Sequence, residues 1–512
     1  MHLLSLPKPQ ARVALAFQSI EDERDWLAKQ PQTQPLLMLN ALYEQIAALD
    51  AADLAPQTAL SLLNTLRKVA VPQQAAIEVR YTRKALPMQV GDQKCFEVAH
   101  RVWTALGIAY LRLAPQLETE QATLALNRAA CGIRLAQYCH FLAACECPPL
   151  LNELLFATLA QCISNNSLHT PLPDPDFPHL GDSNSAGHIS WALLLHLIDP
   201  YRLSAPQLAV ANRGLSRWRE LALFEPTFDE SAKGLTLDLS SAFPAPSAAS
   251  NVHLWLNIRS IVRKLRNRID SLTAGESPES LKLGKELSTT ATLRLLNQMM
   301  DRLKQYKPQT STEIGEIALS FGTENAYAIL KEELLNPHGG LNQKAATIAH
   351  QRMALFGFDR LSQMPSAVKR LNVESEDWNM VDGKALRLPN ERSVRRISPC
   401  LISTRTNNHP RLGVMTGLQL TTSGTLAAEL LWFDDEIEAG WLKQQNAVEL
   451  TKPKQAAFLL HHGTELTLII SNLSHIRPET KLALMDMSIA QVQVTSVIER
   501  GTDFVRYACH LL

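Results

Sequence analysis

The arginines of the segment ERSVRR, residues 391–396, are the side chains best suited to hold an anionic ligand. An arginine guanidinium presents a planar fork of N–H donors, which grips phosphate oxygens in pairs and stacks on flat rings. Arg392 and Arg396 stand four residues apart, and Arg395 lies between them. The segment therefore predicts an anion site. A charged loop between two strands would have the same composition, and this alternative stays open.

A cluster of cysteines raises the question of a metal centre. Cys139, Cys145 and Cys147 lie in one region together with His140. The paired Cys-x-x-Cys knuckles of zinc sites are missing from it, and its apolar residues recur at helical spacing. Because buried cysteine behaves as a small hydrophobic residue, we expect these residues to pack in a core and to bind no metal.

Catalytic motifs are missing from the sequence. It has no Gly-rich phosphate loop, no Gly-x-Ser-x-Gly elbow and no His-Glu-x-x-His motif. The carboxylates Asp434, Asp435 and Glu436 are consecutive, which is unlike the spacing of an acid–base pair. We expect a protein that is not an enzyme and that carries no cofactor.

Composition excludes further classes. The chain has 512 residues, with 50 Lys and Arg against 50 Asp and Glu, so its formal net charge is zero. A non-specific nucleic-acid binder needs a basic surface to displace counterions, so we expect no nucleic-acid partner. The N-terminal residues do not resemble a signal peptide, and no stretch approaches the roughly 20 apolar residues that span a bilayer. We expect a cytoplasmic protein without a membrane span.

Two helical regions are predicted before residue 305. Residues 1–165 form an all-α domain, because apolar residues recur at i, i+3 and i+4 between proline-marked breaks. The loop 167–188 contains four prolines along with Asp174 and Asp176, and we interpret it as a solvated connector. Residues 166–305 then form a second helical region, in which Ser288 is a plausible N-cap. Its basic amphipathic stretch, residues 254–272, suits either an acidic partner or plain solvent exposure.

The C-terminal part, residues 306–512, changes to strand patterns. Two apolar runs separated by Thr-Thr-Ser-Gly predict a hairpin over 412–432, and further short runs follow at roughly 8–12-residue spacing. A helical insertion is predicted at about 325–365. The fold class is thus α+β and multidomain, an all-α body followed by an antiparallel β-barrel. We expect this module to bury the following side chains: Val414, Leu430, Leu468, Ile470, Leu482 and Val494.

The order of these features resembles a family of large proteobacterial cytoplasmic proteins that combine a helical body with a C-terminal PilZ-like domain. The match is carried by LRNRIDSLTAGESPESLKLGKELS, EIALSFGTENAYAIL, WNMVDG, RLGVMTGLQL and VTSVIERGTDFVRYACHL. The resemblance implies a β-barrel that binds cyclic di-GMP and an output to surface behaviours such as pili or attachment.

PilZ domains hold the dinucleotide with Arg-x-x-x-Arg ahead of the first strand and with Asp/Asn-x-Ser-x-x-Gly. Here RLKQYKPQTST precedes the first strand without an arginine pair, and MVDGKALRL keeps only Asp382 of the second motif. In a second register, Arg392-x-x-x-Arg396 stands upstream of a polar turn, residues 420–424. The resemblance thus implies Arg392, Arg395, Arg396 and Asp382 as the ligand-binding candidates.

Three functions remain open. The first is a cyclic di-GMP receptor or effector-type scaffold with degenerate motifs, whose binding is weak or lost unless Arg392 and Arg396 have taken over. The second is a protein-interaction scaffold without a nucleotide ligand. The third is an enzyme that uses the cysteine-rich region. We favour the first class and expect a protein partner in addition to the cyclic dinucleotide.

Overall fold

The computed structural model describes residues 6–228, 230, 234–239, 254–304, 314–336, 373–387, 394–406, 409–443, 454–463, 465–473 and 476–512. The chain divides into two compact units. The first comprises Met1–Pro308 together with Gln419–Gly424, and the second comprises Gln309–Leu418 and Thr425–Leu512.

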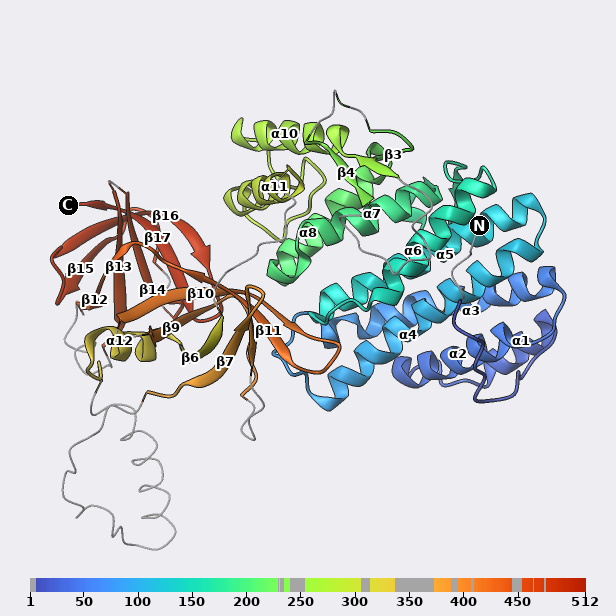
Figure 1. Ribbon diagram of the computed structural model, residues 1–512, viewed down its shortest axis with the longest axis horizontal. Coiled ribbons are helices and arrows are strands. Elements are labelled where there is room, and N and C mark those ends of the chain that lie inside the picture. Colours follow the sequence, from blue (N-terminus) through green and yellow to red (C-terminus); the bar gives the residue numbers. More distant parts are fainter. Residues whose placement is uncertain are drawn as a thin grey trace, which may run out of the picture. The chain divides into compact units, whose positions relative to one another are not determined.

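The first unit is built mainly from helices, which Figure 1 shows in blue to yellow-green. Three of them, α2, α3 and α6, begin with proline, whose fixed φ suits the first helical position. The described α-helices of this unit are α1 (Ile20–Ala28), α2 (Pro35–Asp50), α3 (Pro56–Tyr81), α4 (Val90–Leu113), α5 (Thr119–Ala143), α6 (Pro149–Ser164), α7 (Ser185–Leu197), α8 (Ala205–Trp218), α10 (Arg259–Thr273) and α11 (Thr289–Lys304). The predicted helical body is confirmed.

Helices α4 and α5 pack closely in the centre of this unit. A Cβ atom added to Gly107 would lie 2.7 Å from Cγ1 of Ile133, and one added to Gly132 would lie 3.2 Å from the carbonyl oxygen of Trp103. Glycine therefore permits the close approach of the two backbones. Helix α5 is buried over most of its length, including Cys131 and Cys139.

The helical body also contains two small antiparallel sheets that the sequence patterns did not predict. One pairs β1 (Leu172–Pro173) with β2 (Asp182–Ser183). The other has the order β3–β5–β4, from Leu223–Glu225, Trp255–Asn257 and Thr236–Asp238. Strands of two or three residues are too short to show an alternation of apolar and polar residues, so they carry little signal in the sequence.

Helices α10 and α11 follow the small sheet and match their predicted patterns. In α10, the buried residues include Ile261 and Leu265, whereas Arg263 and Arg266 are exposed. Ser288 precedes α11, and its hydroxyl accepts a hydrogen bond from the backbone N–H of Ala291 at 3.2 Å. This contact confirms the predicted N-cap.

The second unit contains two closed six-stranded barrels, drawn in yellow to red in Figure 1. The first has the order β10–β11–β8–β7–β6–β9, from β6 (Gly315–Phe321), β7 (Glu376–Val381), β8 (Lys384–Arg387), β9 (Cys400–Thr406), β10 (His409–Leu420) and β11 (Leu426–Trp432). The second has the order β12–β13–β14–β17–β16–β15, from β12 (Glu436–Leu442), β13 (Ala456–His462), β14 (Glu465–Ser471), β15 (Lys481–Met485), β16 (Gln491–Arg500) and β17 (Phe504–Leu511). An antiparallel barrel after the helical body is confirmed, but the strands form two barrels where one was predicted.

Details of the second unit differ from the sequence patterns. The run predicted as one strand at 378–388 is a hairpin, because Asp382 and Gly383 form a turn between β7 and β8. Strand β12 was not predicted. Helix α12 (Thr323–Lys331) overlaps the start of the predicted helical insertion, and residues 337–365 of that insertion lie outside the described residues.

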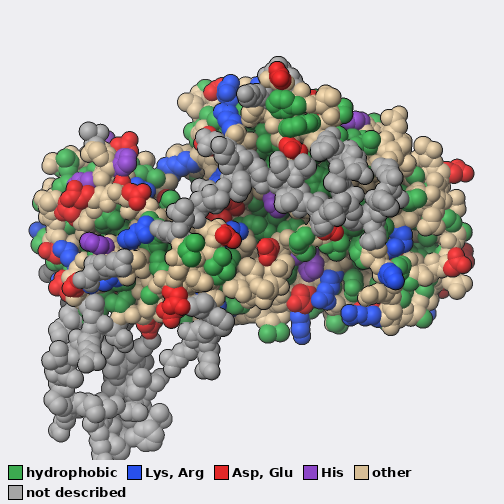
Figure 2. Space-filling view, viewed as in Figure 1, with side chains coloured by type: hydrophobic (Ala, Val, Ile, Leu, Met, Phe, Trp, Pro, Cys, Tyr) green, Lys and Arg blue, Asp and Glu red, His purple; other side chains and the backbone are tan. Residues whose placement is uncertain are grey.

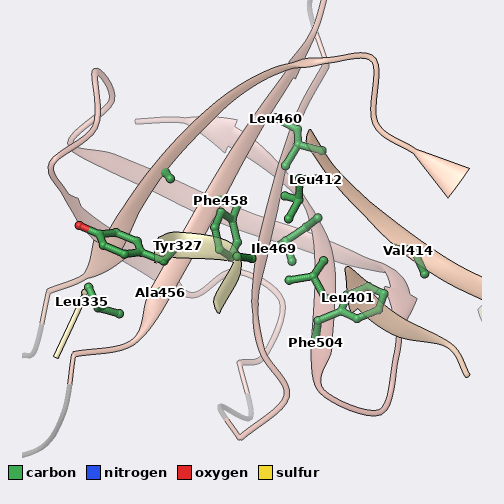
Figure 3. Packing of buried hydrophobic residues seen from close by; sticks show 12 residues of the cluster. Tyr327, Leu335, Leu401, Leu412, Val414, Ala456, Phe458, Leu460, Ile469 and Phe504 are labelled. Atoms are coloured by element: carbon green, nitrogen blue, oxygen red, sulfur yellow. The ribbon is translucent and has the colours of Figure 1, made fainter. Parts of the chain in front are cut away.

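The two barrels share a hydrophobic core, part of which is shown in Figure 3. Leu401, Leu412 and Val414 contribute to it from strands of the first barrel. Phe458 and Ile469 contribute from the second barrel, and helix α12 adds further residues. All five of the named side chains are fully buried. The barrels are therefore packed against each other through apolar outer faces.

A separate core fills the second barrel. Leu468, Ile470 and Val494, all predicted to be buried, belong to it and are 0% exposed. Leu482 is only partly buried at its edge, and Leu430 of the first barrel is also only partly buried. The burial prediction is thus confirmed for Val414, Leu468, Ile470 and Val494, whereas Leu430 and Leu482 are buried only in part.

We expect Phe458→Ala to destabilise both barrels together, because Phe458 lies in the core that they share. Truncation of a buried phenylalanine costs about 3–5 kcal/mol. Hydrogen-exchange mass spectrometry of the full chain should show lost protection in β9 and β10 as well as in β13 and β14. Leu473→Ala, at a side chain that is 82% exposed, is the control. Loss of protection confined to the second barrel would contradict a shared core.

Candidate ligand-binding site

Arg396 is the predicted arginine whose surroundings the structure defines best. Its Nε and Nη2 atoms donate to the same oxygen, Oε1 of Glu376, at 3.1 and 2.7 Å. Its guanidinium carbon lies 3.8 Å from the centre of the Phe321 ring, so the two groups stack. The Arg396 side chain is 23% exposed, which leaves part of the group open to solvent.

Strand register brings a second arginine to the same place. Arg387 lies opposite Trp378 in the β7–β8 pair, and Glu376 lies two residues before Trp378 on the same face of β7. Phe321 shares this face, since Leu319 is paired with Glu376 in the β6–β7 pair. Trp378 and Leu319 are fully buried, so this face is directed toward the barrel interior. Glu376, Arg387 and Phe321 therefore lie at one end of that interior.

Two guanidinium groups share the one carboxylate of Glu376. Nη1 of Arg387 lies 4.0 Å from Oε2 of Glu376 and donates to the carbonyl oxygen of Val394 at 2.6 Å. Desolvation lowers the pKa of Arg387, and the positive charge of Arg396 acts in the same direction, against the attraction of Glu376. Oε2 of Glu376 has no hydrogen-bond partner among the described residues. The charge of Arg396 also acts on Asp503, where it opposes the rise in pKa that burial causes. Two carboxylates therefore offset the two arginines, and a further anion must compete with a carboxylate for Arg396.

The other predicted candidates lie elsewhere or are only partly defined. Arg395 is exposed, and Arg392 lies outside the described residues. Asp382 is exposed in the turn between β7 and β8, where its φ is 49° and that of Gly383 is 78°. Positive φ at both central residues is the requirement of a tight hairpin turn, which Asp-Gly meets well. The geometry thus gives Asp382 a structural role, whereas its predicted role in binding remains untested.

The polar turn of the second motif register, Leu420–Gly424, makes its contacts within the first unit, whereas Arg396 belongs to the second. There, Oε2 of Glu146 accepts a hydrogen bond from the backbone N–H of Thr422 at 2.8 Å. The turn therefore has a structural partner of its own.

The first unit holds a buried ion-pair network that the sequence patterns did not predict. Arg67, with a side chain 1% exposed, pairs with Asp174 at 2.5 Å and also with Asp176. Arg128 lies 3.6 Å from Asp176. The loop interpreted as a solvated connector is thus fixed to helix α3 by two buried carboxylates, and the interpretation is wrong for this part of it. Only the spacing of two aspartates in a proline-rich loop could have suggested such a clamp.

Most of the cysteine-rich region is part of the helical core, as expected, whereas Cys147 is only partly buried. Cys131, Cys139, Cys145 and Cys162 are buried. Desolvation raises the pKa of Cys139 and of Cys145 to about 12, so neither thiol ionises near neutral pH. In the described part of the chain, no group of three or more His, Cys, Asp or Glu residues could hold a metal ion.

Surface charge and helix composition bear on the other predicted partners. Figure 2 shows Lys and Arg side chains interspersed with Asp and Glu on the visible face, in keeping with the zero net charge. None of the described helices combines the length and apolarity needed to cross a bilayer.

The fold and the site together define an α+β protein with a helical body, a double β-barrel and an arginine-rich site at the end of one barrel. Residues 21–227 match a family model described as "Cyclic-di-GMP receptor FimW, N-terminal domain". No curated protein and no solved structure matches the chain. The match lies on the helical body, so it supports the predicted resemblance to a cyclic di-GMP receptor family there. The resemblance of the C-terminal strands to PilZ stays a prediction.

We expect Arg67→Met to destabilise the helical unit by about 3–5 kcal/mol, because it leaves two buried carboxylates without their main counter-ion. Denaturant unfolding followed by far-ultraviolet circular dichroism measures the loss. Arg80→Met is the matched control, since Arg80 pairs with Asp92 at 2.9 Å but has a side chain 56% exposed. A surface pair of this kind contributes about 0–1 kcal/mol. Equal effects of the two substitutions would contradict the role of the buried network.

The buried network around Arg67 also predicts that the stability of the helical unit falls in acid. Burial alone would raise the pKa of Asp174, but its hydrogen bond to Arg67 and the charge of Arg67 outweigh burial and lower it. The pair therefore stabilises the fold above the ordinary pKa of aspartate, and this contribution is lost as pH falls through the lower, folded-state value. Asp174→Asn should remove that part of the acid sensitivity.

The buried side chain of Glu23 predicts that stability changes with pH in the opposite direction. It is 0% exposed, and desolvation raises its pKa to about 7, against an opposing contribution from Thr65. The stability that the protonated form provides is complete below the ordinary pKa of glutamate and is lost as pH rises through about 7. We expect Glu23→Gln to stabilise the helical unit by roughly 2 kcal/mol at alkaline pH and not in acid, in denaturant titrations. Glu21→Gln, at an exposed position, should leave the stability unchanged at both alkaline and acid pH.

Proposed function

We propose that this protein is a non-enzymatic receptor or effector-type scaffold for cyclic di-GMP. The observation that carries the proposal is the match of residues 21–227 to the N-terminal domain of a cyclic di-GMP receptor. A helical body joined to a double barrel suits a protein that couples ligand binding to contacts with a partner protein. The resemblance suggests surface behaviours such as pili or attachment as the output.

The chemistry of the arginine-rich site supports this choice of ligand. Cyclic di-GMP carries two phosphate diesters and two guanine bases. Arginine forks grip phosphate oxygens, and their flat faces stack on bases. Arg387 and Arg396 converge on one carboxylate, and Phe321 adds a flat apolar surface beside Arg396.

A protein-interaction scaffold without a nucleotide ligand is the second candidate. The observation that favours it is that Arg396 already has a protein partner, because two of its donors bind Glu376. A site filled in this way can be purely structural. Titration with the dinucleotide separates the two candidates, since a scaffold of this second kind releases no heat of binding.

We expect Arg396→Ala to weaken cyclic di-GMP binding by the full chain about 10- to 100-fold in isothermal titration calorimetry. A hydrogen bond to a charged group contributes about 1.5–3 kcal/mol, and each 1.4 kcal/mol is a factor of ten in Kd. Arg506→Ala is the matched control in the second barrel. Arg506 lies over Phe433 at 4.8 Å and 3.7 Å from Asp435, and its side chain is 19% exposed.

Comparison with Arg392→Ala/Arg396→Ala tests the second motif register. Further loss in the double variant would assign a ligand contact to Arg392 as well. Tight binding that survives both substitutions would exclude these arginines from the site. Absence of binding by the wild-type chain at millimolar ligand would instead favour the scaffold without a nucleotide.

A further inference from the structure

The carboxylate of Glu376 occupies the position that a ligand phosphate needs at Arg396. Nε and Nη2 are two donors of the guanidinium fork, and both are directed at Oε1 of Glu376, at 3.1 and 2.7 Å. A phosphate oxygen uses the same donors in a paired contact. One face of the guanidinium is already stacked on Phe321. Ligand and carboxylate therefore compete for one edge of one side chain.

Partial burial strengthens this competition. The side chain of Glu376 is 14% exposed and that of Arg387 is 10% exposed, so solvent screens the contact only in part. Glu376 is also held from both sides, since its Oε1 faces Arg396 and its Oε2 faces Arg387 at 4.0 Å. Removing the carboxylate leaves the two guanidinium groups with only Asp503 as a nearby negative charge, which raises their affinity for any anion that can enter.

We propose that Glu376 is an internal competitor of the ligand, which sets the affinity of the Arg387–Arg396 site by occupying the fork of Arg396 in the ligand-free state. This inference rests on the proposed function and deepens it. Binding of a phosphate diester exchanges one oxyanion for another at Arg396 and displaces the carboxylate toward Arg387 or solvent. Glu376 thus lowers the affinity for the dinucleotide while it stabilises the empty site.

The test is calorimetric titration of the full chain with cyclic di-GMP, comparing wild type with Glu376→Gln. The amide keeps the size of the side chain but removes its charge, so we expect Kd to fall at least about tenfold, the equivalent of one charge-assisted contact. Glu376→Asp keeps the charge and should stay closer to wild type. In Glu376→Gln/Arg396→Ala the gain should disappear, because it acts through Arg396.

The outcomes separate this inference from the proposed function. Binding by wild type with equal or weaker binding by folded Glu376→Gln would overturn the competitor role and leave the receptor function standing. Tight binding only by Glu376→Gln would support the competitor role, whereas the absence of binding by wild type would count against the receptor function. If neither protein binds, both proposals fall. Circular dichroism and thermal melting establish that each variant is folded. If Glu376→Gln does not fold, Glu376→Ala takes its place in the titration, and we expect the same gain in affinity for cyclic di-GMP.

Discussion

The shared core of the two barrels is the contact on which the second unit depends. A closed six-stranded barrel normally buries one face of each strand and exposes the other. Here Leu401, Leu412 and Val414 are buried on the outer face of the first barrel, against Phe458 and Ile469 of the second. Strands at this interface are consequently buried on both faces. Neither barrel can lose its neighbour without exposing a large apolar surface to water.

This double burial explains which strands could be predicted from sequence. Strand β13, Ala456–His462, has five consecutive buried residues, and β14 has a similar run. Such continuous apolar runs bounded by turn residues are visible in a sequence. Strand β12 begins with an alternation of acidic and apolar residues, which is a strand signal, but Glu436 was considered only as part of the acidic run that starts at Asp434. The Asp382–Gly383 turn was a hairpin signal that the comparison with ligand motifs obscured.

Closure into two barrels was not accessible to the same reasoning. Strands β6 and β9 pair through Ser320 and Phe321, and β14 pairs with β17 across an intervening hairpin. These pairings join residues that are distant in the sequence, and local periodicity does not specify them. The helical body was more predictable, because each helix carries its own apolar spacing. Its small sheets and the clamp on Arg67 depend on tertiary contacts and left no periodic signal.

The candidate site contains one residue that could be predicted from the sequence and others that could not. Arg396 could be predicted from its side chain alone, since few residue types bind phosphate in pairs. Glu376 and Arg387 could not, because only the register of β7 with β8 places them together. One arginine of the pair is therefore visible in the sequence, whereas the carboxylate that holds it is apparent only from the structure.

The electrostatics of the empty site require a carboxylate such as Glu376. Two largely buried guanidinium groups that face one another repel, and desolvation makes each more costly. With Glu376 in place, the positive charge of the two guanidinium groups is offset, and the barrel end can fold before any ligand arrives. A phosphate diester supplies the same single negative charge and can replace the carboxylate one for one. Glu376 therefore stabilises the unliganded barrel and also opposes the ligand. The affinity of this site is set by the difference in interaction free energy between the carboxylate and the phosphate at Arg396.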